Sequence, residues 1–334
     1  MNESGRPDAR EDAPPTLALA VIGLDGTGEA FARAGMLHAG FRLVTVADPR
    51  AERGAAVAGR LGVPFAPAYL DVLNDPTLDG LVVAGDVADR STILAEAAVR
   101  GRTVLAMAPP AGTLTRLDDL ILTALEGGAR IACPNPWRVV PAMVLAERQL
   151  REPGIGQPLA VFAAHRTKAA TGDPLVELGL PLLDYLVGAI RSEVVQVQAT
   201  SAMLFGAAGQ GEPDTWLLLL RFRTGLIATV ELGRSLPAAF PTDSEVRVEF
   251  VGSERVVVAE AENLGVTTYA GDGSVRRDES GPDAHRALLD GFLPAVREAQ
   301  APEESLVTLR WVMPLIEAAR RSASEGAPIA MTRW

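Results

Sequence analysis

Short apolar runs alternate with helical patterns from Leu17 to about Pro134. The runs LALAVIG, FRLVTVAD, GLVVAG and RTVLAM contain few polar residues, and glycines stand near the ends of the helical segments between them. Apolar strands separated by helices are typical of a parallel sheet that is covered on both faces. The segment therefore predicts a doubly wound α/β domain.

The pattern is different in the rest of the chain. Helices are expected at Val139–Leu150 and about Val176–Val187, on either side of the strand LAVFAAHRTK. Six strand-like runs follow, joined by short turns, which favours antiparallel pairing. Two helices, at about His285–Glu298 and Ser305–Ser324, end the chain. We therefore expect a disordered acidic tail over residues 1–15, the α/β domain over 16–134, and an α+β domain with a large, mainly antiparallel open sheet over 135–334.

The composition restricts the partners. The chain has 334 residues, with 31 basic and 42 acidic side chains and a net charge of -11. Such a surface would not attract nucleic acid or an anionic membrane. Three scattered histidines and one cysteine have no metal-ligand spacing, so we predict no metal. The single cysteine and the lack of an apolar run of ~18 residues favour a cytoplasmic protein without membrane spans.

A glycine turn follows the first predicted strand. It reads Gly23-Leu24-Asp25-Gly26-Thr27-Gly28, it precedes a helix, and Asp48 ends the next strand. A strand, tight turn, helix and acidic residue in this order form the frame of a dinucleotide site, in which the helix N-terminus holds the pyrophosphate and the acid accepts ribose hydroxyls. The predicted cofactor residues here are Gly23, Asp25, Gly26, Thr27, Gly28 and Asp48.

Asp25 stands where a glycine normally lets the backbone approach the pyrophosphate. A carboxylate about 4 Å from a phosphate charge is repelled by up to about 4 kcal/mol at an effective dielectric constant of about 20, or roughly a thousandfold in affinity. Alternatively, Asp25 caps the helix as an anion in the place of the missing phosphate. Two interpretations stay open: a dinucleotide site, and a structural turn that binds dinucleotide weakly or not at all.

The order of parts resembles the Gfo/Idh/MocA family, the relatives of glucose–fructose oxidoreductase and inositol dehydrogenase. The resemblance extends from Leu17 to Ile329 and includes the segments VADPRAERGAAVAGRLGV, LDVLNDPTLDGLVVAG, NPWRVVPAMVLAERQLREPGIGQPLAVF and VTLRWVMPLIEAARRSASEGAPI. It implies a Rossmann domain for NAD or NADP, followed by a domain that takes a sugar-like substrate and forms a homodimer or hetero-oligomer through its sheet. It also implies cofactor contacts at Ala84, Ala108 and Pro109.

Several positions depart from the family pattern. The lysine of the family's Glu-Lys-Pro aligns with Ala108, and an often catalytic histidine aligns with Pro181, whereas the aspartate three residues later is kept as Asp184. Neither alanine nor proline titrates, although a positioned acid or base contributes about 100- to 10,000-fold to such reactions. A standard sugar dehydrogenase mechanism is therefore not expected. The further departures are Asp25, Asp86 and Arg90.

Lys168 is the single lysine among the 31 basic residues. It ends the strand LAVFAAHRTK, and strand alternation puts Arg166 on its face and His165 on the opposite face. Its amine would supply a titratable group, or it is a solvated side chain at the edge of the sheet. The candidate catalytic residues are therefore Asp184 and Lys168.

Three functions remain as hypotheses. The preferred one is a family member that keeps the fold but has lost the standard chemistry and acts as a binding, regulatory or scaffold partner. The second is an active NAD(P)-dependent oxidoreductase on a sugar-like or other small alcohol or carbonyl substrate, in which Asp184, Lys168 or the substrate itself moves the proton. A non-redox enzyme built on the same pocket is the third.

Overall fold

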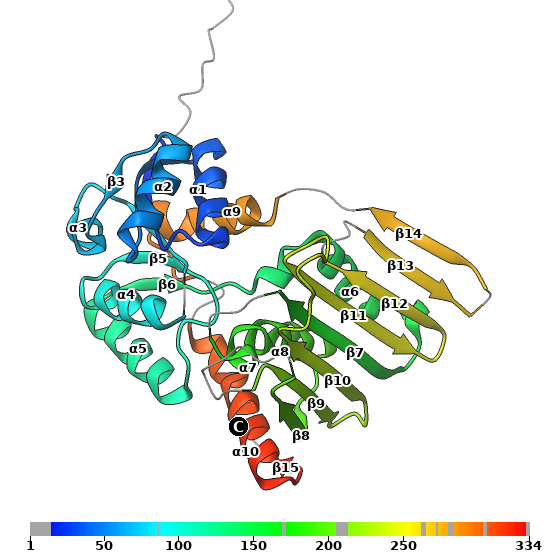
Figure 1. The fold of residues 1–334 in the computed structure, drawn as a ribbon. Coiled ribbons are helices and arrows are strands. Elements are labelled where there is room, and N and C mark those ends of the chain that lie inside the picture. The colour runs from blue at the N-terminus through cyan, green and yellow to red at the C-terminus, as the bar shows by residue number, and fades with distance from the viewer. Residues whose placement is uncertain are drawn as a thin grey trace, which may run out of the picture.

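Two units are built on two sheets in this computed structural model (Figure 1). The structure describes residues 15–85, 87–168, 172–204, 213–261, 265–271, 273–279, 283–302 and 306–331. The expected acidic tail, except Pro15, and the departure at Asp86 lie outside these residues. We call the six-stranded sheet and its helices the first unit, and the nine-stranded sheet and its helices the second unit.

The first sheet is parallel, with strand order β3-β2-β1-β4-β5-β6. This is the Rossmann order, and it confirms the predicted doubly wound fold. Strands β4 and β5 are buried at every position because helices cover both faces. The strands are β1 (Leu17–Ile22), β2 (Phe41–Ala47), β3 (Phe65–Ala66), β4 (Gly80–Val83), β5 (Thr103–Ala106) and β6 (Arg130–Ala132). The helices between them are α1 (Gly26–Leu37), α2 (Ala51–Leu61), α3 (Tyr69–Asn74), α4 (Val87–Val99) and α5 (Leu114–Gly127).

The second sheet is mixed and mainly antiparallel, as expected. Its order is β14-β13-β12-β11-β7-β10-β9-β8-β15, and only the pair of β7 and β10 is parallel among the described strands. The first five strands are β7 (Pro158–Thr167), β8 (Val194–Ala202), β9 (Thr215–Phe222), β10 (Ile227–Gly233) and β11 (Ser244–Gly252). The others are β12 (Arg255–Glu260), β13 (Gly265–Ala270), β14 (Val275–Glu279) and β15 (Ile329–Ala330).

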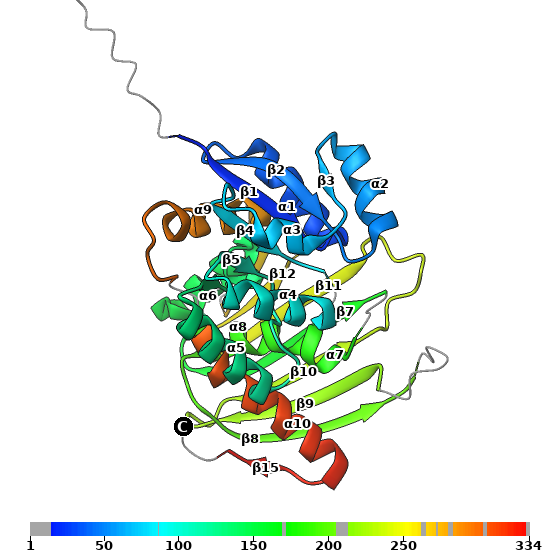
Figure 2. The same ribbon diagram turned by 90° about the vertical axis from the view of Figure 1, so that its left-hand side faces the viewer.

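Helices cover one face of the second sheet, and α10 lies along β8 (Figure 2). The single helix predicted at Ser305–Ser324 is wrong, because a 3₁₀ helix precedes α10 there. Pro314 lies in the first turn of α10, where proline's missing N–H is tolerated. The helices of this unit are η1 (Pro136–Arg138), α6 (Pro141–Arg151), η2 (Pro153–Ile155), α7 (Pro174–Glu177), α8 (Gly179–Ile190), η3 (Leu306–Trp311) and α10 (Met313–Glu325). Among the described helices, none has both the length and the apolar character to cross a membrane.

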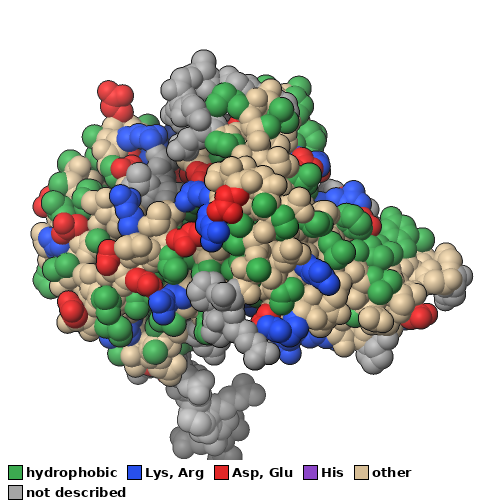
Figure 3. Space-filling view, turned by 90° about the horizontal axis from the view of Figure 1, so that it is seen from below, with side chains coloured by type: hydrophobic (Ala, Val, Ile, Leu, Met, Phe, Trp, Pro, Cys, Tyr) green, Lys and Arg blue, Asp and Glu red, His purple; other side chains and the backbone are tan. Residues whose placement is uncertain are grey.

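Apolar side chains on the other face of the second sheet are exposed to solvent. Strand β9 alternates between buried and exposed residues, so one of its two faces is left uncovered. Figure 3 shows hydrophobic side chains on the side of the molecule that carries this sheet. Four large side chains, 40–51% exposed, define what we call the open sheet face: Phe162, Leu217, Leu219 and Ile227.

Helix α9 (Ala284–Arg297) returns to the first unit and packs against α1, β5 and β6. Its residue Phe292 is 1% exposed and stacks on Phe41 of β2, with 6.1 Å between the ring centroids. Asp290 lies 2.9 Å from Nε2 of His38, which follows α1. Helix α9 lies after residue 134, where the sequence predicts the end of the first domain, yet it packs with the first unit. Its apolar face completes the core of the first sheet.

Candidate functional site

The glycine turn between β1 and α1 is built by close backbone approach. Gly23 has a φ of +86°, and a Cβ on it would lie 2.5 Å from the carbonyl oxygen of Ala84, just after β4. A Cβ on Gly28 would lie 1.7 Å from the carbonyl oxygen of Gly23. Both distances are far too short for a side chain, so these two glycines are required by the turn itself. The turn therefore lies where the carboxyl ends of β1 and β4 meet.

Asp25 is the N-cap of α1. Its side-chain oxygen accepts a hydrogen bond of 2.9 Å from the backbone N–H of Gly28. The capping role considered for Asp25 is thus confirmed, and its side chain lies at the positive end of the helix dipole. The backbone around Gly26 is more open, because no heavy atom would lie within 4 Å of a Cβ there.

A second carboxylate stands in the first turn of α1. Glu29 pairs with Arg33 of the same helix and with Arg60 of α2. The hydrogen bond from Arg60, and then that from Arg33, lower the pKa of Glu29. Two carboxylates, Asp25 and Glu29, therefore lie at the start of α1. Glu29 is paired with two arginines, whereas Asp25 accepts the backbone N–H of Gly28.

Asp48, the expected acceptor for ribose hydroxyls, is only 1% exposed. It accepts hydrogen bonds from the backbone N–H groups of Leu24 and Arg50, at 2.6 and 2.7 Å. Arg53 of α2 places Nε 2.9 Å and Nη2 2.8 Å from the same carboxylate. The Nη2 contact is an ion pair without hydrogen-bond geometry, so the carboxylate accepts three of these hydrogen bonds, two at Oδ2 and one at Oδ1. Asp48 ties the end of β2 to the glycine turn.

Arg90 joins the ends of β4 and β5. Its guanidinium is buried and donates to the carbonyl oxygens of Met107 and Pro109, at 3.0 and 2.9 Å, and also to that of Gly85. Between those acceptors lies Ala108, whose half-buried methyl group packs against the main core. The edge where the family resemblance implies a lysine thus holds an inert methyl group and a buried arginine that binds backbone.

Asp184 of α8 binds the segment that links the two units. Its Oδ2 accepts a hydrogen bond of 2.6 Å from Asn135 and lies 3.5 Å from Nη2 of Arg138. Arg138 also donates to the backbone carbonyl of Asp184 at 3.1 Å, and Asn135 donates to that of Pro181 at 2.8 Å. The carboxylate, 14% exposed in its side chain, therefore holds the linker in place.

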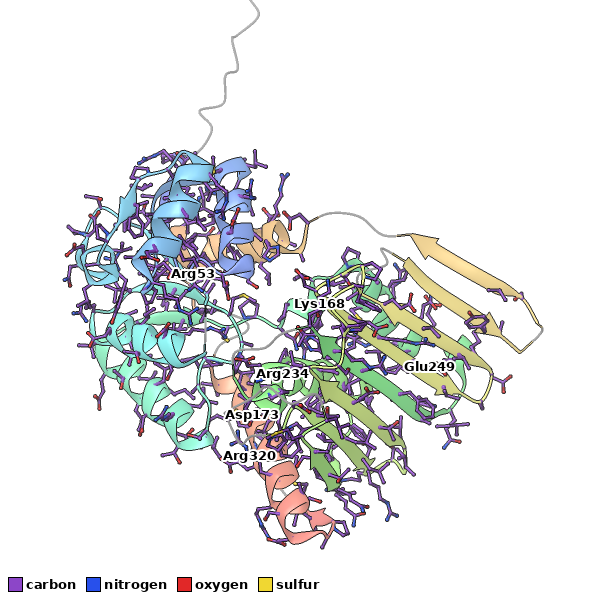
Figure 4. The ribbon with its side chains drawn as sticks, in the orientation of Figure 1. Arg53, Lys168, Asp173, Arg234, Glu249 and Arg320 are labelled. Carbon is purple, nitrogen blue, oxygen red and sulfur yellow. The ribbon has the colours of Figure 1, made fainter. Side chains whose placement is uncertain are left out.

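Lys168 follows β7 and has a different partner. Its Nζ lies 3.2 Å from Oδ1 of Asp243, and its backbone N–H donates to the carbonyl of the same residue at 3.0 Å. Figure 4 shows Lys168 at the end of β7 in the second unit, whereas Arg53 lies on the first unit. The two candidate catalytic residues are thus each bound to a separate partner, Lys168 to Asp243 and Asp184 to the linker.

The predicted alternation along β7 is confirmed. Arg166 lies on the uncovered side and pairs with Glu231 and Glu245. His165 lies on the covered side, where its ring nitrogens are 3.2 Å from the carbonyl of Leu178 and 3.3 Å from Oγ of Ser244. Burial lowers the pKa of His165 to about 4, so the ring is neutral at pH 7. It is a buried core histidine rather than a charged site residue.

Two residues of this site were not singled out from the sequence. Asn135 precedes Pro136 and Trp137, and its side chain accepts a bond of 2.9 Å from the backbone N–H of Trp137. Asn directly before Pro is a turn and cap signal that would have pointed to it. Arg53 lies in the first turn of α2, five residues after Asp48 at the end of β2. A basic residue this close to an acidic one at a strand end would have suggested the ion pair.

The strand order of the first sheet and the glycine turn define an α/β protein with a Rossmann-type fold. Residues 17–133 match the family model described as the Gfo/Idh/MocA oxidoreductase family, NAD-binding Rossmann fold. Similarity continues beyond that segment, through 87% of the chain in one relative. The first unit thus matches the Gfo/Idh/MocA family model, and the similarity to chains named inositol 2-dehydrogenase runs through both units.

Curated relatives and solved structures extend this similarity. Inositol 2-dehydrogenase 1 of Saccharopolyspora erythraea is 26% identical over 308 residues, which are 87% of this chain and 89% of that protein. Inositol 2-dehydrogenase of Acidothermus cellulolyticus is 24% identical over 265 residues, or 77% and 76% of the two chains. The crystal structure of GenD2 from gentamicin A biosynthesis, in complex with NAD, matches with a TM-score of 0.81 at 22% identity, over 96% of this chain and 98% of that one. At this identity the last match supports the fold alone.

Proposed function

We propose that this protein keeps the family fold and a pocket for a small sugar-like ligand, but does not perform the standard NAD(P)-dependent dehydrogenase reaction, and acts as a binding or partner protein. The hydrogen bond from Gly28 to Asp25 carries the proposal. It fixes a negative charge at the helix N-terminus, which in Rossmann enzymes receives the pyrophosphate.

The residues around the turn do not fit a dinucleotide in the usual mode. A phosphate at the start of α1 would have to displace the Asp25 carboxylate or lie against it, which is unfavourable by up to about 4 kcal/mol. Asp48 already accepts three hydrogen bonds, so a ribose hydroxyl would compete with Leu24, Arg50 and Arg53 for this carboxylate. The charge of Asp25 thus opposes NAD or NADP at the phosphate end, and the partners of Asp48 weaken the expected contact with the ribose.

The positions expected to carry proton-transferring groups also lack them. Ala108 and Pro181 have no titratable group, and Asp184 is already engaged by Asn135 and Arg138. These side chains support ligand binding better than alcohol oxidation.

An active NAD(P)-dependent oxidoreductase with a rearranged relay is the second candidate. The similarity to two chains named inositol 2-dehydrogenase, over most of this chain, favours it. In that case Asp184, Lys168 or the substrate itself would take the hydroxyl proton. A small alcohol or carbonyl compound would be the substrate class.

Titration of the purified protein with NADH and NADPH separates the two candidates. We expect a dissociation constant of about 1 mM or weaker for both by isothermal titration calorimetry, because Asp25 repels the phosphates. No nicotinamide absorbance change is expected with myo-inositol and NAD. A dissociation constant of about 10 μM or tighter, or steady turnover, would overturn the first candidate and support the second.

The open sheet face supports a homodimer or a hetero-oligomer with a related chain. Its four large apolar residues lie on neighbouring strands, and Thr229 of β10 pairs with Phe162 on one side and Leu219 on the other. An exposed apolar patch of this kind is typical of a protein contact. We also expect the protein in the cytoplasm, where the buried thiol of Cys133 stays reduced.

Replacing Phe162 with aspartate is expected to weaken self-association by about tenfold or more, because a charge would be buried in the contact. Sedimentation velocity over a range of protein concentrations measures the change. Leu122→Asp is the matched control, since Leu122 is similarly exposed at 57% but lies on α5 of the first unit. A monomeric wild-type protein, or equal weakening by both variants, would contradict the proposed dimer surface.

A further inference from the structure

A pocket of about 390 Å³ lies between α9 and the edge of the first sheet. Leu105 and Ala132, on β5 and β6, form one wall, and Phe292 and Ala295 of α9 form another. Because these four side chains are at most 7% exposed, the pocket reaches into the core of the first unit. Its lining includes neither the glycine turn nor Asp184, so it is a space separate from the candidate site.

The polar side chains of the lining are engaged by other residues. Among the described residues, Arg138 and Gln300 supply these polar side chains. Arg138 pairs with the carboxylate of Asp184 and donates to the backbone carbonyl of the same residue. The side-chain amide of Gln300 donates to Glu298. The other lining members are apolar side chains and one glycine, so a ligand in this pocket would meet hydrocarbon rather than an unpaired charge.

Two residues of α9 that line the pocket are poor helix formers. Gly291 and Pro294 both lie inside the helix, which runs from Ala284 to Arg297. Glycine and proline are the least favourable residues in a helix interior, because glycine loses the most backbone freedom and proline lacks the N–H for the helical hydrogen bond. No heavy atom would lie within 4 Å of a Cβ at Gly291, so packing does not require a glycine there. Its effect is to keep the pocket open, since a longer side chain would enter it.

The volume and the lining suit a small neutral ring system. An apolar cavity of about 150 Å³ holds one benzene molecule, so a pocket of 390 Å³ has room for two fused rings. Small-molecule sites commonly have volumes of about 300–1,000 Å³ and mainly apolar walls. An anionic or cationic group would have to leave water for these walls without a counter-charge to bind, which is unfavourable.

We propose that this pocket is a second binding site, for a small neutral molecule with two fused aromatic or alicyclic rings. Such a ligand would cover the side chains of Leu105 and Phe292, and its affinity would come from the apolar area that is buried. It would also touch both connections between the units, because Pro134 belongs to the one after β6 and Pro302 to the one after α9.

The compounds 2-naphthol and 2-naphthoate form a matched pair of probes for the full-length protein, since the first is neutral and the second anionic at pH 7. Saturation-transfer NMR and calorimetry should give a dissociation constant of about 1 mM or tighter for 2-naphthol, and at least fivefold weaker binding for 2-naphthoate. Gly291→Leu places a side chain in the pocket and should weaken the binding of 2-naphthol at least tenfold.

Gly59→Leu is the control variant. Gly59 is also an exposed helical glycine with no heavy atom within 4 Å of its Cβ position, but it lies on α2. It should leave the binding of 2-naphthol unchanged. Ala287→Leu, a second filling variant on α9, serves if Gly291→Leu does not fold. The proposal is overturned if 2-naphthol shows no binding at about 3 mM, if the filled variant binds it as wild type does, or if 2-naphthoate binds equally well.

Discussion

Replacing Asp25 with glycine is expected to raise the affinity for NADH by about 10- to 1,000-fold. The variant removes the carboxylate from the N-terminus of α1 and leaves four backbone N–H groups there for a phosphate. The loss of the cap itself should cost only a few tenths of a kcal/mol, because glycine is also accepted at the N-cap. Isothermal titration calorimetry of both proteins with NADH measures the gain.

Asp283→Gly is the matched control for that experiment. Asp283 caps α9 through a hydrogen bond of 2.9 Å to the backbone N–H of His285, so its replacement removes the same charge and the same kind of cap elsewhere. It should leave NADH binding unchanged. If Asp25→Gly gives no gain, repulsion by Asp25 is not what limits binding, and the contact between Asp48 and Arg53 becomes the next group to test.

Replacing Phe292 with alanine is expected to lower the free energy of unfolding by about 3–5 kcal/mol. The ring is 1% exposed and fills the space between α9 and the first sheet, where it stacks on Phe41. Its removal would leave a cavity in the core of the first unit. Urea denaturation followed by circular dichroism gives the change.

Leu37→Ala serves as the comparison for Phe292→Ala. Leu37 is 81% exposed on α1, so its truncation should alter stability by no more than about 0.5 kcal/mol. An equally small effect of Phe292→Ala would contradict the assignment of α9 to the core of the first unit.

Local patterns were enough to predict much of this molecule. The apolar runs gave the order of the first sheet's strands along the chain, and the alternation along β7 correctly placed Arg166 and His165 on opposite faces. Asp25 could be predicted as a cap because the cap and its donor, Gly28, are three residues apart. Interactions of this short range depend on the neighbouring sequence, which is directly visible.

Long-range contacts could not be predicted in the same way. Asp48 is the expected acid at the end of β2, but its hydrogen bonds with Leu24 and Arg53 depend on how the turn and α2 pack. The bond from Asn135 to Asp184 joins residues 49 positions apart. For α9, periodicity gave the helix but did not indicate which sheet its apolar face would cover.

The return of α9 to the first unit also determines when that unit can mature during synthesis. Strands β1 to β6 leave the ribosome long before Leu289 and Phe292, which cover β5 and β6. Until those residues emerge, the nascent sheet exposes an apolar face that a domain folding by itself would already have buried. We therefore expect the first unit to complete its core only after α9 has been synthesised. Until then its exposed apolar face should bind chaperones.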